Sequence, residues 1–154
     1  MKTIILMTVM FLTVAFDRPA MAEGRIFYYG YILAQETGQF VDDKIIVNGT
    51  GEGISSLGRF TVTYRAELNF VTNRSTGTQQ LTFQNGDVLN TDTRGIGQPP
   101  FHNMAVVNEL ASIRGDRSGT GRFAGVVGEF SIDRTVDLST GKTFGTFKGD
   151  FVKP

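Results

Sequence analysis

The sequence has 154 residues, with 15 lysines and arginines against 15 aspartates and glutamates, and it contains no cysteine. Without an excess of positive charge or a basic stripe, the chain lacks the features that favour binding to nucleic acid. Without cysteine it can form neither disulfides nor thiolate metal sites. Its length suits a single domain with a substantial core.

The chain begins with a predicted secretory signal peptide over residues 1–22. Lys2 precedes an apolar run over residues 4–16, and Ala20 and Ala22 are the small residues expected before a cleavage site. The run is shorter than the ~20 residues that a membrane-spanning helix needs. An N-terminal strand or anchor helix is the alternative for this run. We therefore expect a secreted or periplasmic protein whose mature chain, residues 23–154, has no membrane contact.

The mature chain is predicted to be all-β, because its β-branched and aromatic segments are short and separated by glycine-rich turn signals. The clearest strand covers residues 59–70, where apolar and polar side chains alternate, so that one face is buried. Further strands are expected at residues 27–33, 44–48, 79–84, 88–93, 105–114, 122–136 and 143–152.

Glycine-rich segments are predicted as turns or bends. Turns are expected at residues 36–38, 49–53, 75–77 and 139–141, and a bent strand at residues 118–130. The segment 49–53 lacks the GK[ST] ending of a phosphate-binding loop. Pro99 and Pro100 place residues 95–103 in a loop. Residues 58–86 and 121–149 carry similar motifs at equal overall spacing, which suggests two related hairpins.

About eight strands without a covering helix favour a closed antiparallel barrel, because closure leaves no unpaired edge. An open sandwich of two sheets fits the same composition. A barrel of this size can be filled by its own side chains or can hold one small ligand. The sequence has 13 phenylalanines, of which 11 lie in residues 23–154, and these are enough to fill the barrel.

Residues 119–128 read GTGRFAGVVG, and residues 137–141, DLSTG, precede a terminal phenylalanine-rich strand. This pattern resembles the C-terminal half of the allene oxide cyclase and dirigent superfamily, and residues 57–60, LGRF, are similar to its bacterial members. The resemblance implies a single, calycin-like, eight-stranded antiparallel barrel that binds a flexible, mostly apolar small molecule. In some members the barrel also controls cyclisation or coupling of that molecule without a cofactor. The resemblance assigns no catalytic residue.

Glu109 is the candidate catalytic residue. It interrupts an alternating row that is otherwise apolar and consists of Ala105, Val107, Ala111 and Ile113. If this row faces inward, the Glu109 carboxylate is desolvated, its pKa is raised, and it can act as a general acid or orient a polar ligand group. In the opposite register Glu109 lies on the surface.

Tyr64, Tyr29 and Phe60 are candidate ligand contacts. Tyr64 lies on the apolar face of the clearest strand, where its hydroxyl could point at a ligand or lie at the barrel rim. The first strand carries three tyrosines, and at least one must face outward, where it could contact another copy of the chain. His102, the only histidine, lies in the proline-containing loop, so we expect neither a catalytic triad nor a metal site.

Two functions fit these features. The first is a secreted or periplasmic barrel that binds a small hydrophobic ligand and, if it is an enzyme, acts as a cyclase or isomerase without cofactor or metal. The second is a non-catalytic, filled barrel that acts through its surface or as a homo-oligomer. A cavity inside the barrel would distinguish them.

Overall fold

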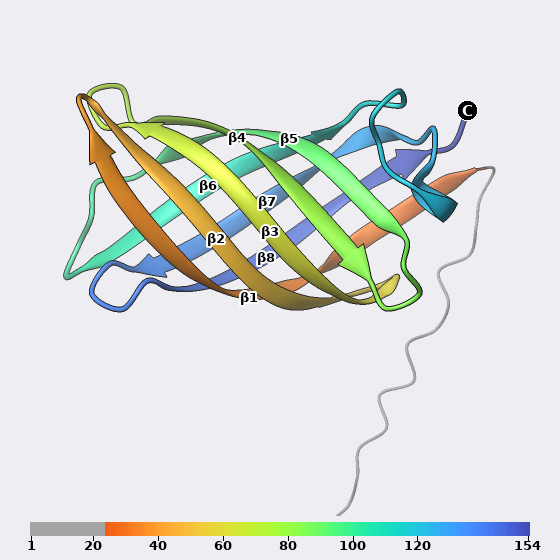
Figure 1. Ribbon diagram of the computed structural model, residues 1–154, viewed down its shortest axis with the longest axis horizontal. Helices are drawn as coiled ribbons and strands as arrows, with labels where there is room; N and C mark the ends of the chain where they lie inside the picture. Colours follow the sequence, from red (N-terminus) through yellow and green to blue (C-terminus); the bar gives the residue numbers. More distant parts are fainter. Residues whose placement is uncertain (1–23) are drawn as a thin grey trace, which may run out of the picture.

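The computed structural model describes residues 24–154, which form a closed barrel of eight antiparallel strands (Figure 1). The predicted signal peptide lies outside the described residues. The strands are β1 (Arg25–Val41), β2 (Lys44–Ser55), β3 (Gly58–Asn69), β4 (Arg74–Phe83), β5 (Val88–Gly97), β6 (Met104–Ile113), β7 (Val127–Asp137) and β8 (Lys142–Val152). The predicted all-β, eight-stranded antiparallel barrel is confirmed, and the open sandwich is excluded.

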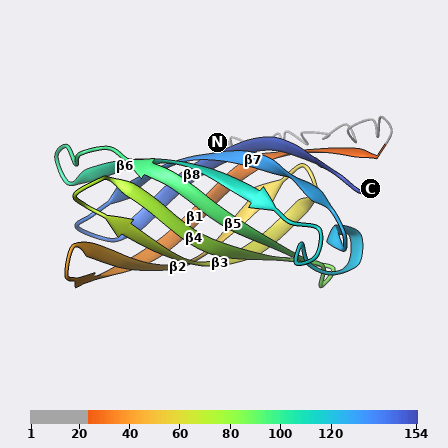
Figure 2. The same ribbon diagram turned by 90° about the horizontal axis from the view of Figure 1, so that it is seen from above.

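Each strand pairs with the next one along the chain, and β8 pairs with β1 to close the sheet. The start of β1 and the C-terminus lie at the same end of the barrel in both views (Figures 1 and 2). The Lys153 N–H donates to the carbonyl oxygen of Gly24 at 3.3 Å. We call this the termini end. The opposite end carries the β1–β2, β3–β4, β5–β6 and β7–β8 turns, and we call it the hairpin end.

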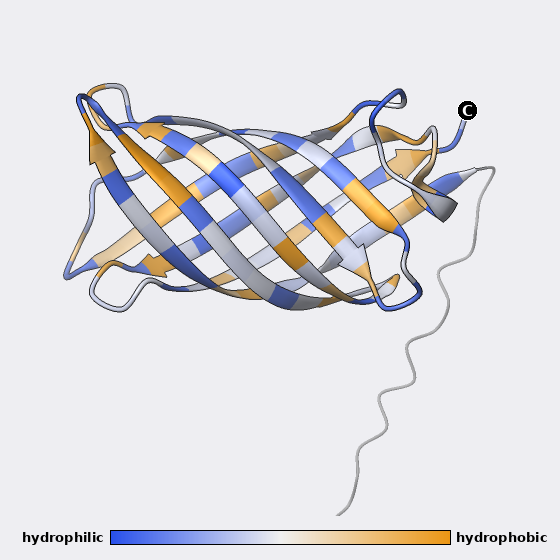
Figure 3. Ribbon diagram, in the orientation of Figure 1, coloured by the Kyte–Doolittle hydropathy of each residue, from blue (hydrophilic) through white to orange (hydrophobic). Residues whose placement is uncertain are grey.

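Alternation along each strand decides which side chains fill the barrel. In β3, Phe60, Val62 and Ala66 are at most 5% exposed, whereas the intervening Thr61 and Thr63 are exposed on the outer face. The same alternation appears as successive blue and orange segments along the strands in Figure 3. Within residues 24–154, no helix has the length and apolar character needed to cross a membrane.

The turns predicted at residues 36–38, 49–53 and 75–77 are wrong, because β1, β2 and β4 run through them without interruption. Gly49 and Gly53 in β2 serve interior packing instead of chain reversal. A Cβ atom at Gly49 would overlap the ring of Tyr64, and one at Gly53 would overlap the ring of Phe60. Each glycine pairs with that aromatic residue across the β2–β3 ladder, so it leaves room for the ring.

Aromatic rings fill the half of the interior next to the termini end. Tyr28 stacks on Phe147 with ring centroids 4.6 Å apart and meets Phe130 edge-on at 5.0 Å. Phe60 contacts Phe83 at 5.5 Å and Phe147 at 5.8 Å. These rings belong to one continuous cluster of buried residues. We call this part of the interior the aromatic half.

The segment between β6 and β7 closes the termini end. It contains a short 3₁₀ helix, η1 (Gly121–Phe123), and Phe123 is fully buried with its ring 4.8 Å from that of Phe83. The Ser118 hydroxyl donates to the carbonyl oxygen of Phe123 at 2.6 Å and accepts from the N–H of Gly125 at 2.9 Å. The strand predicted from residue 122 therefore begins only at Val127. Gly121 and Gly125 have φ angles of 58° and 80°, which a strand residue does not adopt.

The two segments with similar motifs each contain a hairpin, β3–β4 and β7–β8, but they are not structural copies. The turn predicted at residues 139–141 is confirmed, since the N–H of Gly141 donates to the Asp137 carbonyl oxygen at 2.7 Å. Gly86 lies in a turn with a φ of 86°, whereas its counterpart Gly149 lies inside β8. The shared motifs thus occupy different elements.

Candidate functional site

Four polar side chains from four strands meet inside the half of the barrel next to the hairpin end. The Arg134 guanidinium on β7 donates from Nε to Glu109 Oε2 at 2.8 Å and from Nη2 to Glu109 Oε1 at 3.2 Å. Its Nη1 donates to Oε1 of Glu36 on β1, which also accepts from the hydroxyl of Tyr64 on β3 at 2.6 Å. We call Glu36, Tyr64, Glu109 and Arg134 the charge cluster.

Strand register brings the charge cluster together. Each of its members occupies an inward-facing position, and glycines on neighbouring strands provide the space. Gly95 pairs with Glu109 across β5 and β6, and a Cβ atom at Gly95 would lie 2.6 Å from Cγ of Glu109. Gly49 makes the corresponding room for the Tyr64 ring.

The charge cluster is buried, and its environment shifts the pKa values of Arg134 and Tyr64. The side chains of Glu36, Glu109 and Arg134 are 9%, 2% and 10% exposed. Burial lowers the pKa of Arg134, but the charges of Glu109 and Glu36 outweigh this effect and raise it overall. Burial, with the Glu36 charge, raises the pKa of Tyr64 well above its ordinary value. Arg134 therefore stays charged, and Tyr64 stays a hydrogen-bond donor.

Several buried polar atoms beside the charge cluster have no hydrogen-bond partner within the described part of the chain. They are Ser75 Oγ, Gln79 Oε1, Thr91 Oγ1 and Thr143 Oγ1. Buried polar atoms of this kind are normally paired with protein, water or a ligand. This side of the interior could therefore accept water molecules or a small polar group.

The candidate residues chosen from the sequence lie in three different places. Glu109 faces inward and is 5% exposed, which is one of the two registers that its alternating row left open, and Tyr64 belongs to the same charge cluster. Phe60 packs in the aromatic half at 3% exposure. Tyr29 is 45% exposed on the outer face, so it cannot share an interior site with the other three. His102 is exposed in its loop, as expected.

Arg134 and Glu36 were not among the candidates from the sequence. Arg134 interrupts an inward row formed by Phe130, Ile132 and Val136, which is the same signal that pointed to Glu109. Glu36 belongs to the turn predicted at residues 36–38, and a turn residue is not expected to face the interior of a barrel.

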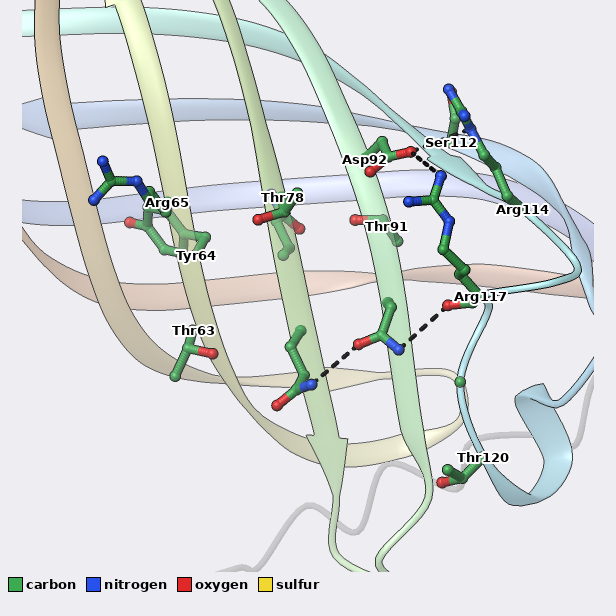
Figure 4. A pocket seen from close by; sticks show the side chains of 14 residues that line it. Thr63, Tyr64, Arg65, Thr78, Thr91, Asp92, Ser112, Arg114, Arg117 and Thr120 are labelled. Atoms are coloured by element: carbon green, nitrogen blue, oxygen red, sulfur yellow. Dashed lines mark hydrogen bonds and ion pairs between the residues drawn. The ribbon is translucent and has the colours of Figure 1, made fainter.

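The outer face carries a hollow of about 780 Å³ over β3, β4, β5 and β6, one wall of which is the segment after β6 (Figure 4). We call it the outer hollow. Its outward-facing lining is polar and consists of Thr63, Arg65, Thr78, Gln80, Asn90, Asp92, Ser112, Arg114, Arg117 and Thr120. Asp92 lies 3.1 Å from Arg114 and 3.8 Å from Arg117. A second hollow, of about 460 Å³, lies on the outer face of β1 to β4 and includes Arg59.

No protein-family model, curated protein or solved structure matches the chain. In the part of the chain that the structure describes, no group of three or more His, Cys, Asp or Glu side chains could hold a metal ion. The function must therefore be argued from the charge cluster and the outer hollow themselves.

Proposed function

We propose that this protein is a non-catalytic binding module that engages its ligand on the outside of a filled barrel. The observation that carries this proposal is the packing of the aromatic half. Neighbouring rings are packed at centroid distances between 4.6 and 5.8 Å in the order Tyr28, Phe147, Phe60, Phe83 and Phe123. These contacts match the spacing of directly packed aromatic pairs and leave no place for another ring between them.

The other half of the interior supports the same proposal. Arg134 uses both edges of its guanidinium on Glu109 and Glu36, and Tyr64 donates to Glu36. The bidentate pair with Arg134 engages both carboxylate oxygens of Glu109 and fixes their geometry. Proton transfer by Glu109, as first predicted, would require this pair to break.

The predicted signal peptide supports a secreted or periplasmic location for such a module. The outer hollow and the exposed apolar side chains of β1 then face the medium and are available to ligands or to a second copy of the chain. Phe27, Tyr29, Tyr31 and Leu33 on β1 are between 39% and 50% exposed.

A small ligand inside the barrel is the second candidate, and the unpartnered buried atoms favour it. Ser75, Gln79, Thr91 and Thr143 present polar atoms that a ligand could satisfy. The resemblance to the allene oxide cyclase and dirigent superfamily agrees with this alternative, with Glu109 and Tyr64 as polar contacts to a mostly apolar molecule.

Native mass spectrometry of residues 23–154, before and after organic extraction, tests the two candidates. For a filled barrel we expect the mass of the chain alone in both samples, and no mass increase on incubation with fatty acids or aromatic compounds. The Phe123→Ala variant is the positive control, because it opens an apolar cavity that can take up a small aromatic compound.

A co-purifying molecule of a few hundred daltons that extraction removes would overturn the filled-barrel proposal. In that case Glu109→Gln and Tyr64→Phe should weaken its retention, whereas the outward-facing Tyr29→Phe should not.

A further inference from the structure

We propose that the outer hollow binds an acidic oligosaccharide, an inference that rests on the proposed function because it requires a ligand on the outside of the barrel. The lining combines guanidinium groups, for carboxylates, with an ordered array of hydroxyl and amide groups, for sugar hydroxyls. This combination and its geometry carry the inference.

Strand register arranges the lining in two parallel rows across the sheet. One row runs from Arg65 to Thr78, Asp92 and Ser112, each paired directly with the next. The other runs from Thr63 to Gln80 and Asn90. Neighbouring strands are about 4.8 Å apart, so the rows offer polar groups at a regular spacing. Such rows fit an extended ligand with repeated hydroxyls.

The segment after β6 forms a wall along these rows. Ser118 and Thr120 continue the pairing with β5 in place of β6, since the Asn90 N–H donates to the Ser118 carbonyl oxygen at 2.8 Å. The N–H of Arg117 donates to the carbonyl oxygen of Arg114 at 2.9 Å, so the chain turns tightly between these two arginines. Both guanidinium groups are therefore held at the same side of the hollow (Figure 4).

The charge of the lining favours an anion. Three arginines, Arg65, Arg114 and Arg117, line the hollow together with a single carboxylate, that of Asp92, and Arg65 lies at the β3 side, away from the other two (Figure 4). Arg114 and Arg117 share Asp92, and Arg65 forms no salt bridge with any residue that the structure describes.

The acidic groups at the border of the hollow are paired with other residues. Asp116 lies 3.8 Å from Arg117. Glu129 lies 3.7 Å from Arg94 and accepts a hydrogen bond from the Ser112 hydroxyl. Arg65 is thus free for a carboxylate of the ligand, and its planar fork suits bidentate pairing.

The neutral groups are already oriented for hydrogen bonding. Gln80 Nε2 donates to Asn90 Oδ1 at 3.1 Å, and Asn90 Nδ2 donates to the Arg117 carbonyl oxygen at 3.3 Å. This chain of amides fixes both side chains, and the Gln80 side-chain oxygen accepts no hydrogen bond from the described residues. A ligand with hydroxyl groups can donate to that oxygen, and its carboxylates can accept from the arginines.

Titration followed by ¹H–¹⁵N NMR tests this inference, since the chain has no tryptophan for a fluorescence assay. We choose a tetramer of galacturonic acid as the probe, its methyl ester as the uncharged counterpart, and inorganic phosphate as the simple anion. The side-chain amide signals of Gln80 and Asn90 should shift with the acid tetramer. The ester and phosphate should each bind at least about tenfold more weakly, because each lacks one of the two kinds of contact.

Matched variants place the binding at the outer hollow. We expect Arg65→Ala, Arg114→Ala and Arg117→Ala together to weaken binding of the acid tetramer at least about tenfold. The control removes the same charge from exposed positions elsewhere: Arg59→Ala, Arg74→Ala and Lys148→Ala. Equal loss in both variants, equal binding of ester or phosphate, or no shift with a folded chain would overturn the inference. A ligand found inside the barrel by mass spectrometry would instead overturn the proposed function.

Discussion

Arg134 holds together three strands, of which β1 is far from β6 and β7 in the sequence. Its guanidinium connects β7 to Glu109 on β6 and to Glu36 on β1. Because all three side chains are at most 10% exposed, each charge depends on its partners for the interactions that water would otherwise provide. Loss of the Arg134 side chain would therefore leave two buried carboxylates, those of Glu36 and Glu109, without a counter-charge.

Replacing Arg134 by Met should lower the free energy of unfolding by about 3–5 kcal/mol, because two buried carboxylates lose their counter-charge. Urea denaturation of the variant measures this loss. Arg134→Met combined with Glu109→Gln should be more stable than Arg134→Met alone, since one of the uncompensated charges is then removed. An Arg134→Met variant as stable as the unmodified protein would contradict the buried ion pair.

Tyr28 gives the stability of the protein a dependence on alkaline pH. Burial raises the pKa of this fully buried phenol well above its value in the unfolded chain. The protonated phenol therefore stabilises the fold fully below about pH 10, and this contribution falls as pH rises further, because the unfolded chain releases the proton first. Replacing Tyr28 by Phe should reduce the loss of stability above pH 10 by about 1.4 kcal/mol per pH unit.

Urea denaturation at several pH values between 8 and 12 checks the Tyr28 prediction. Below pH 10, Tyr28→Phe should leave stability unchanged or raise it, because the Tyr28 hydroxyl has no partner among the described residues. Parallel stability curves for the two proteins above pH 10 would show that Tyr28 ionises in the folded state.

Glycine has two different structural roles in this fold. In the segment between β6 and β7 that closes the termini end, Gly121 and Gly125 adopt positive φ angles and shape the backbone. In β2, Gly49 and Gly53 lie in regular strand and provide room for the rings of β3. The first use depends on backbone freedom, and the second depends on the absence of a side chain.

Gly53→Ala should destabilise the barrel by about 1–3 kcal/mol, because the new methyl group overlaps the Phe60 ring and the carbonyl oxygen of Tyr31. Gly38→Ala is the matched control on the neighbouring strand, where the nearest atom, Ile45 Cγ2, would be 3.2 Å away. Urea midpoints should separate the two variants. Phe60→Leu should restore part of the loss in Gly53→Ala, and equal midpoints for both glycine variants would refute the packing role.

The sequence predicted the elements that alternation alone defines. The strand at residues 59–70 follows from a period of two and is confirmed. The same period left two registers open for the row of Glu109, and the structure shows that this row faces inward. The full lengths of β1 and β2 could not be predicted, since glycines inside a strand look like turn signals in the sequence. Gly49 and Gly53 of β2 accommodate rings of β3, and Gly38 of β1 lies beside Ile45. Glu36 was missed because of such a turn signal, whereas Arg134 could have been found from its row.

At the scale of the molecule, the outer surface is uneven in hydrophobicity. Apolar side chains are exposed at all four turns of the hairpin end: Phe40, Val41, Phe70, Val71, Ile96, Phe101, Met104 and Leu138. A second apolar surface follows the outer face of β1 through Tyr29, Tyr31 and Leu33. A continuous exposed stripe on a strand can bury more area against a second copy than separate turn residues can.

We expect concentration-dependent association of the protein through the β1 stripe, measured by sedimentation velocity. Tyr29→Ser together with Leu33→Ser should shift the protein to the monomer. Phe101→Ser is the control, because Phe101 is 75% exposed at the hairpin end and should leave association unchanged. A monomer at every concentration, or a loss of association only with Phe101→Ser, would contradict this prediction.

The hydrogen bond between Lys153 and Gly24 has a consequence for the order of the strands. Because the two ends of the described chain meet at one ladder, joining them with a short linker would make the backbone a ring, and any exposed turn could become the new start. A circular permutant opened between Asn85 and Gly86 should form the same barrel. The order of its strands would then begin with β5 and end with β4. Closure of the barrel therefore does not require β1 to be the first strand of the chain.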